Sequence, residues 1–237
     1  RPVSWRESKR RIDALAAGLW TLGLRKGDRV AILSQTRPEW AQADHAAYTL
    51  GAIVVGVYPT SSLEDAGHNL RHSGAAAVFV EDATQLARVT RLRPELPALR
   101  HVIVIDPPAA AAGEEWLPLA AVMASGLETL DRDPGLPERC RAEVHTNDVA
   151  TIVYTSGTTG APKGAVLTHA NLFNVLDGIS GAFDLSTQDV TVIALPLAHI
   201  LQRAVLYCGL QLGGVAYYAP SIERIKETWQ VAQPTIV

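Results

Sequence analysis

One stretch of the sequence decides the fold: Tyr154-Thr155-Ser156-Gly157-Thr158-Thr159-Gly160-Ala161-Pro162-Lys163-Gly164. Its three glycines let the backbone adopt φ > 0 and approach a ligand closely. Hydroxyls and free backbone N–H groups that turn inward form a concave surface that suits an anion. Lys163 adds a mobile positive charge with three hydrogen-bond donors. Together these residue types predict a loop that holds phosphate.

The spacing within this loop differs from that of the common phosphate loop of nucleoside triphosphatases. That loop reads G-x-x-x-x-G-K-[ST] and opens directly into a helix. Here two residues separate Gly160 from Lys163, and Gly164 stands where Ser or Thr is required. Residues 150–153 and 165–168 are typical of strands. The sequence therefore predicts a strand–loop–strand element in which hydroxyls, backbone amides and the lysine bind phosphate without a helix N-terminus.

An ordinary Gly/Thr-rich turn in a β-hairpin is the alternative for this stretch. Such a turn needs only about two to five loop residues and no lysine after a proline. We therefore favour the phosphate loop.

The remaining sequence alternates between helical and strand patterns. We expect strands at 29–33, 53–58, 77–80, 101–105, 189–195 and 215–218, and helices at 5–22, 38–50, 63–72, 83–93, 171–181, 201–212 and 222–231. Repeated βα units predict an α/β fold with a mostly parallel sheet flanked by helices. Between 106 and 147, prolines and an alanine run interrupt the pattern, and we expect a surface excursion with one helix at 116–125.

Composition limits the classes of function. The chain has 237 residues, of which 48% are hydrophobic, and this content supports a packed core. Its net charge of −3 gives no electrostatic basis for binding nucleic acid. Cys140 and Cys208 lack metal-ligand spacing and are typical of reduced thiols in the cytoplasm. The N-terminus is polar, and no run of 18 apolar residues occurs, so we expect a cytoplasmic location.

Two stretches resemble a known family. Residues 154–164 match, without a break, the signature loop of the adenylate-forming (AMP-binding) superfamily, which includes acyl-CoA synthetases, peptide-synthetase adenylation domains and luciferases. Residues 195–200, Leu-Pro-Leu-Ala-His-Ile, followed by Arg203, resemble the next motif of its long-chain fatty acid–CoA ligase branch. Gln202 stands where many long-chain members carry an acidic residue, so the chain departs from that branch at this position. The resemblance covers essentially the whole chain.

The resemblance implies an activity and a set of site residues. The implied reaction is ATP-dependent activation of a long-chain fatty acid to an acyl-adenylate and then to acyl-CoA, with ATP, Mg²⁺ and coenzyme A. It implies catalytic roles for Lys163 and His199, the latter beside the acyl pocket, and a Mg²⁺ contact for Thr158. The implied nucleotide-binding residues are Thr155, Ser156, Gly157, Thr158, Thr159, Gly160 and Lys163.

The resemblance also implies that parts of the site lie elsewhere. The family's Tyr-Gly-x-Thr-Glu and Thr-Gly-Asp sequences, which serve adenine, Mg²⁺ and ribose, do not occur in this chain. We therefore expect residues 1–237 to be a partial adenylation domain, truncated at both ends, without the C-terminal lid and inactive alone. The alternatives are adenylation of an aryl or amino acid and a non-catalytic nucleotide-binding fragment. The expected partners are fatty acid, ATP and coenzyme A, with peripheral membrane contact; chain-length preference and oligomeric state stay open.

Overall fold

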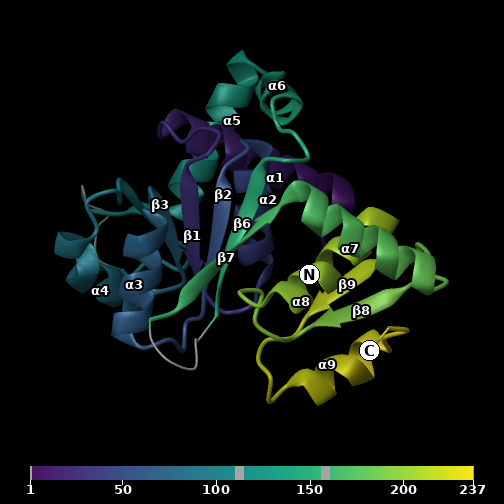
Figure 1. Cartoon of the computed structure of the whole chain (residues 1–237). Helices are drawn as coiled ribbons and strands as arrows, with labels where there is room; N and C mark the ends of the chain where they lie inside the picture. Colours follow the sequence, from purple (N-terminus) through teal and green to yellow (C-terminus); the bar gives the residue numbers. More distant parts are fainter. Residues whose placement is uncertain (1, 110–114, 156–160, 237) are drawn as a thin grey trace.

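Figure 1 shows the computed structural model of the chain, which describes residues 2–109, 115–155 and 161–236. Within these ranges, seven strands form one sheet in the order β5-β4-β3-β1-β2-β6-β7, and two more form a second sheet, β8-β9. The strands are β1 (Arg29–Leu33), β2 (Ile53–Val57), β3 (Ala77–Val80), β4 (His101–Val104), β5 (Leu117–Pro118), β6 (Val149–Thr155), β7 (Lys163–Thr168), β8 (Val190–Ile193) and β9 (Val215–Tyr218).

Helices connect the strands, and capping side chains start several of them. The helices are α1 (Trp5–Thr21), α2 (Pro38–Thr49), α3 (Leu63–Ser73), α4 (Ala83–Leu92), α5 (Leu119–Arg132), α6 (Leu136–Ala142), α7 (His169–Ala182), α8 (Ile200–Leu212) and α9 (Ile225–Ala232). Ser62 caps α3 by accepting a hydrogen bond from Asp65 N, and Gly74 ends that helix with φ +62°. Thr168 caps α7, so this helix begins two residues before the predicted Asn171.

The large sheet is parallel from β5 through β6, and only β7 runs antiparallel, beside β6. Its central strands are buried on both faces, as expected when helices cover both sides of a parallel sheet. In β1, Val30 and Ile32 belong to the core under α1, α2 and α8, whereas Ala31 and Leu33 belong to the core under α3 and α4. The predicted α/β class with a mostly parallel sheet is confirmed.

The second sheet forms a smaller layer beside the first. β8 and β9 pair in parallel, α8 and α9 pack against them, and α7 packs against α8 (Figure 1). Three residues of α8, Leu206, Tyr207 and Cys208, are buried in the core of the large sheet. Because α8 thus packs on both layers, it fixes how the motif at its N-terminus lies relative to the large sheet.

The prediction for residues 106–147 was wrong. This segment contributes an edge strand, β5, and two helices, α5 and α6, rather than a surface excursion with one helix. Helix α5 packs against α1, where Gly18 and Gly126 bring the two backbones together. Two of the prolines that suggested an excursion lie at helix starts: Pro118 caps α5, and Pro137 is near the first position of α6.

Candidate functional site

The predicted phosphate loop lies between two strands, as the sequence indicated. β6 and β7 pair antiparallel with Thr155 opposite Lys163 and Tyr154 opposite Gly164. Directly opposed residues place their side chains on the same face of a sheet, so the hydroxyl of Thr155 and the ammonium of Lys163 share a face. Both residues are exposed. The other predicted binding residues, Ser156, Gly157, Thr158, Thr159 and Gly160, lie outside the described residues.

Gly164 follows the lysine for a steric reason. A Cβ at this position would lie 2.8 Å from Ile152 Cγ2 and 3.3 Å from Tyr154 Cζ. The ring of Tyr154, which is 8% exposed, therefore lies against the bare backbone of the neighbouring strand. A Ser or Thr, as in the common phosphate loop, would overlap Ile152 and the ring.

Two histidines of α3 contact both sides of this hairpin. His68 Nε2 lies 2.9 Å from the carbonyl oxygen of Pro162, and His72 Nδ1 lies 2.8 Å from the hydroxyl of Tyr154. Their rings stack with centroids 5.3 Å apart and an interplanar angle of 16°. Sequence reasoning missed both residues. Their spacing of four on one helix, which places them on one face, was the signal available.

The second motif lies at the carboxyl ends of the parallel strands. The hydroxyl of Thr36, which follows β1, donates to Leu195 O (2.7 Å) and accepts from Leu197 N (3.0 Å). Gly56 of β2 packs so closely on Ala198 that a Cβ would lie 2.9 Å from its Cα. Thr155 ends β6, the neighbour of β2, at the same end of the sheet. The two predicted motifs therefore lie at the sheet edge where open α/β folds bind ligands.

His199 is exposed and caps α8. Its Nδ1 accepts a hydrogen bond of 3.2 Å from the backbone N of Leu201. In the neutral ring Nδ1 is then the acceptor and Nε2 carries the proton. No hydrogen bond joins His199 to Lys163 in the part of the chain that the structure describes. The structure thus places the two predicted catalytic residues at one end of the sheet without joining them.

Arg203 of α8 is paired with residues that are distant in the sequence rather than with its neighbour Gln202. Its side chain is fully buried, and its Nη1 lies 3.4 Å from Asp44 Oδ1 of α2. Its Nη2 donates to Thr151 Oγ1 of β6 at 3.0 Å. The neighbouring Gln202 makes no helix-end ion pair; its Oε1 instead accepts from Leu195 N at 3.0 Å. Arg203 therefore joins α8 to the strand that leads into the predicted phosphate loop.

Two tyrosines complete the surroundings of this buried pair. Tyr207 donates to Asp44 Oδ2 at 2.6 Å, and Tyr48 lies 3.4 Å from Arg203 Nη1. Burial, followed by the charge of Asp44, raises the pKa of the Tyr207 hydroxyl well above its ordinary value, so it stays a donor. Burial alone lowers the pKa of Arg203, but Tyr207, Tyr48 and Asp44 together raise it, so the guanidinium stays charged.

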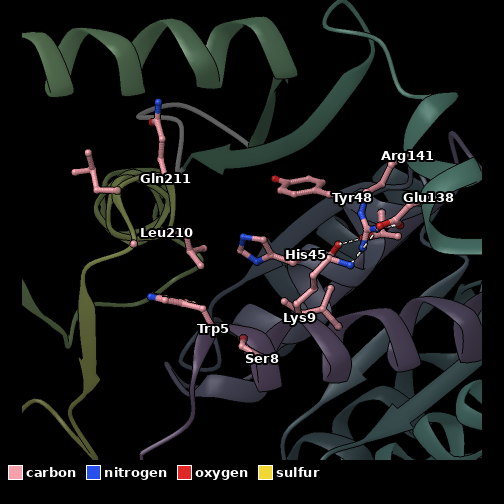
Figure 2. A pocket seen from close by; sticks show the side chains of 13 residues that line it. Trp5, Ser8, Lys9, His45, Tyr48, Glu138, Arg141, Leu210 and Gln211 are labelled. Atoms are coloured by element: carbon pink, nitrogen blue, oxygen red, sulfur yellow. Dashed lines mark hydrogen bonds and ion pairs between the residues drawn. The ribbon is translucent and has the colours of Figure 1, made fainter. Parts of the chain in front are cut away.

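Figure 2 shows a cavity of about 700 Å³ among α1, α2, α6 and α8. His45 and Tyr48 of α2 line it, together with Lys9, Glu138 and Arg141 at one end. Lys9 and Arg141 both form ion pairs with Glu138, so these two cations are already compensated within the chain. None of the predicted site residues within the described ranges lines this cavity. It is therefore separate from the candidate phosphate site.

The described ranges contain neither a metal cluster nor a membrane-spanning helix. There, no group of three or more His, Cys, Asp or Glu side chains is placed to hold a metal ion. Among the helices of the same ranges, none has both the length and the apolar character that crossing a bilayer requires. Thr158, the predicted Mg²⁺ contact, lies outside the described residues.

Solved structures share the α/β fold of this chain. An anthranilate CoA ligase, AuaEII, in complex with anthranoyl-AMP, has a TM-score of 0.83 at 23% identity, over 99% of this chain and 44% of that one. ATP-bound MatB from Rhodopseudomonas palustris has a TM-score of 0.78 at 24% identity, over 98% of this chain and 43% of that one. A family model described as "AMP-binding enzyme" matches residues 1–237. The chain belongs to this family.

A curated relative agrees with that assignment. The long-chain-fatty-acid–CoA ligase FadD15 of Mycobacterium bovis is 35% identical over 237 residues. The alignment covers 99% of this chain and 38% of the relative. The chain thus spans well under half of the length of this ligase.

Proposed function

We propose that the protein is an AMP-forming long-chain fatty acid–CoA ligase. A fatty acid carboxylate attacks the α-phosphorus of ATP to give acyl-AMP and pyrophosphate, and the thiol of coenzyme A then displaces AMP to give acyl-CoA. The proposal concerns the whole protein, because the chain spans 38% of the Mycobacterium bovis relative. We further propose that residues 1–237 form the part of the adenylation domain that carries the phosphate loop.

One observation carries the proposal: the hydroxyl of Thr155 and the ammonium of Lys163 share a face of the sheet where strands β6 and β7 meet their connecting loop. Thr155 and Lys163 are paired and exposed, and the family motif runs between them. Catalysis of adenylation depends mainly on positioning two anions and on stabilising charge that develops on phosphate oxygens. Lys163 supplies a positive charge and Thr155 a hydroxyl donor at the place where the β- and γ-phosphates of ATP would lie.

Magnesium fits this proposal through oxygen ligands. Mg²⁺ binds few protein groups and takes the remaining ligands from phosphate and water. The hydroxyls of Thr155 and Thr158 are of the required type, and when bound the ion neutralises charge on the phosphates. Among the described residues no group of three or more His, Cys, Asp or Glu is placed to hold a metal ion, and the protein contact that we propose for the ion is the hydroxyl of Thr158.

His199 is proposed to border the acyl site. It is exposed at the N-terminus of α8, and Gly56 and Thr36 hold the residues before it against the ends of β1 and β2. The long-chain substrate is supported by FadD15 at 35% identity. The proposal includes a cytoplasmic location, supported by two free cysteines, and peripheral contact with the membranes into which long-chain acids partition.

The test is fatty-acid-dependent ATP–pyrophosphate exchange by the full-length protein and by its Lys163→Ala variant. Each charged hydrogen bond to phosphate contributes about 1.5–3 kcal/mol, so we expect exchange to fall about tenfold to a hundredfold. Lys226→Ala, which removes an exposed lysine of α9, is the matched control and should exchange at the normal rate. Normal exchange by Lys163→Ala would show that the assigned role is wrong. Exchange with anthranilate but not with palmitate would overturn the long-chain substrate.

A further inference from the structure

Two histidines on one helix contact both ends of the proposed phosphate-binding hairpin. His68 and His72 lie one turn apart on α3, with their rings stacked. Tyr154 lies edge-on to both rings, at centroid distances of 6.1 Å and 5.8 Å. The two imidazoles and the phenol therefore form one aromatic group between α3 and the end of β6.

The hydrogen bonds of this group reach the residues next to Thr155 and Lys163. A carbonyl oxygen only accepts, so His68 Nε2 must carry the proton that it donates to Pro162 O. Pro162 immediately precedes Lys163. His72 Nδ1 bonds the hydroxyl of Tyr154, which immediately precedes Thr155. Each histidine thus holds the neighbour of one of the two paired residues.

Helix α3 is a rigid base for these contacts. Its opposite face is packed, with Ala66 fully buried and Leu70 1% exposed in the core beneath α3 and α4. Gly67 lies so close to Leu92 of α4 that a Cβ would approach Leu92 Cδ2 to 2.8 Å. Because this packing holds α3 in place, the hydrogen bonds of His68 and His72 can hold the hairpin at a fixed position relative to the helix.

We propose that His68 and His72 are positioning residues that fix where Lys163 and Thr155 lie. The inference rests on the proposed function, because positioning matters only if these two residues bind the phosphates of ATP. His72 is exposed and His68 is half-buried, and both hydrogen bonds are part-buried, so losing one of them costs about 0.5–1.5 kcal/mol of stability. A displaced lysine, in contrast, reduces catalysis strongly, since an error of about 1 Å can cost up to a hundredfold.

The experiment uses paired variants of the full-length protein, with KM for ATP and kcat measured in the exchange reaction. His68→Phe keeps an aromatic ring and removes the donor to Pro162; His68→Gln restores an amide donor near the position of Nε2. His72→Phe and His72→Asn are the equivalent pair for Tyr154. Arg71→Gln on the exposed side of α3, where Arg71 pairs with Glu95, is the control.

We expect each phenylalanine variant to lose about fivefold in kcat/KM for ATP, with the melting temperature lowered by only about 2–6 °C. The amide variants should recover most of that loss, and Arg71→Gln should match the unaltered protein. His72→Phe and Tyr154→Phe should be non-additive, because each removes the same hydrogen bond. Values of kcat/KM within twofold of the unaltered protein for both phenylalanine variants would overturn the inference, as would losses that track melting temperature.

A second measurement separates this inference from the proposed function. Amide hydrogen exchange at Tyr154 and Gly164, which are paired across the hairpin, should be faster in both phenylalanine variants and unchanged in Arg71→Gln. If the unaltered protein shows no ATP–pyrophosphate exchange, the ligase proposal fails, and the amide rates alone decide whether the histidines hold the hairpin. Unchanged amide rates in both phenylalanine variants would show that they do not.

Discussion

Arg203 and Asp44 are opposite charges in a part of the molecule that water does not reach. Both side chains have zero exposure. Removing an ion from water costs several kcal/mol, which the attraction between the partners and their further hydrogen bonds must offset. Thr151 and Tyr207 provide such bonds. A pair of this kind adds little net stability, but either charge left alone is strongly unfavourable.

Replacing Asp44 by alanine should therefore destabilise the chain by about 3–5 kcal/mol, because the buried guanidinium of Arg203 loses its carboxylate. Urea denaturation followed by circular dichroism measures the change. The double variant Asp44→Ala/Arg203→Met should recover part of the loss, since no unpaired charge remains. Glu95→Ala, which breaks an exposed ion pair with Arg71, should change stability by less than about 1 kcal/mol. A loss for Asp44→Ala no larger than this control would contradict the account.

The sequence identified Arg203 as part of a motif but did not identify its partner, Asp44. Asp44 lies 159 positions earlier, and nothing local to either residue indicates that they meet. A weak signal existed: Asp44 interrupts the apolar face that Trp40, Ala43 and Ala47 form on α2. A carboxylate on such a face requires a buried partner. The sequence shows that a partner is needed, whereas its identity depends on the packing of α8.

Among the helices, the contact of α1 with α5 depends on two glycines. A Cβ at Gly126 would overlap the Ala14 carbonyl oxygen and lie 2.7 Å from Gly18 N. A Cβ at Gly18 would lie 2.9 Å from Val122 Cγ1 and overlap the Val122 carbonyl oxygen. Glycine is a poor helix former by about 1 kcal/mol relative to alanine. Its presence inside both helices is explained by the close approach of the two backbones.

Two glycine-to-alanine substitutions should have opposite effects on stability. Gly126→Ala gains about 1 kcal/mol of helix propensity but forces α5 away from α1, and overpacking costs about 1–3 kcal/mol or more. Because the overlap is with backbone atoms, we expect a net loss. Gly178→Ala in α7 meets no atom within 4 Å and should gain up to about 1 kcal/mol. Thermal unfolding of both variants is the measurement, and stabilisation by Gly126→Ala would refute the packing argument.

Elements with strong local signals were predicted well, and those defined by packing were not. The strands at 29–33, 77–80 and 215–218 were predicted with the bounds observed. The helix expected at 116–125 spans Leu119–Arg132. Leu117 and Pro118 instead form the edge strand β5, because they pair with β4, and this pairing is set by the fold. The role of α5 became clear only from the glycine contact with α1, which pairs positions 108 residues apart.

Over the whole molecule, the sequence predicted the class of fold, an α/β domain with a mostly parallel sheet. It did not indicate that β8 and β9 form a separate sheet, because alternating βα units have the same pattern whether they extend one sheet or begin another. Nor did it reveal that α3 contacts the hairpin. The predicted site residues with distinctive chemistry, Lys163 and His199, were visible as a motif. The side chains that contact the segments beside them, such as His68 and Thr36, are ordinary residues brought together by the fold.

The pH dependence of stability just below neutrality depends on two histidines. Burial lowers the pKa of His101, which donates to Leu22 O, and burial likewise lowers the pKa of His169. Below the ordinary value of 6.5, the unfolded chain therefore binds more protons than the folded one, and stability falls as pH decreases from about 6.5 towards the lowered values. Asp148 and Asp189, with pKa values below 3.8, act only in a more acidic range.

We expect the free energy of unfolding to decrease between pH 7 and pH 5, and to decrease less in a double variant, His101→Gln/His169→Phe. Glutamine keeps a donor for Leu22 O, and phenylalanine keeps the ring contact of His169 with Tyr48 while removing a buried Nε2 that has no partner among the described residues. Urea denaturation at steps of half a pH unit measures both curves. Parallel curves would show that other groups cause the acid sensitivity, since neither replacement titrates in this range.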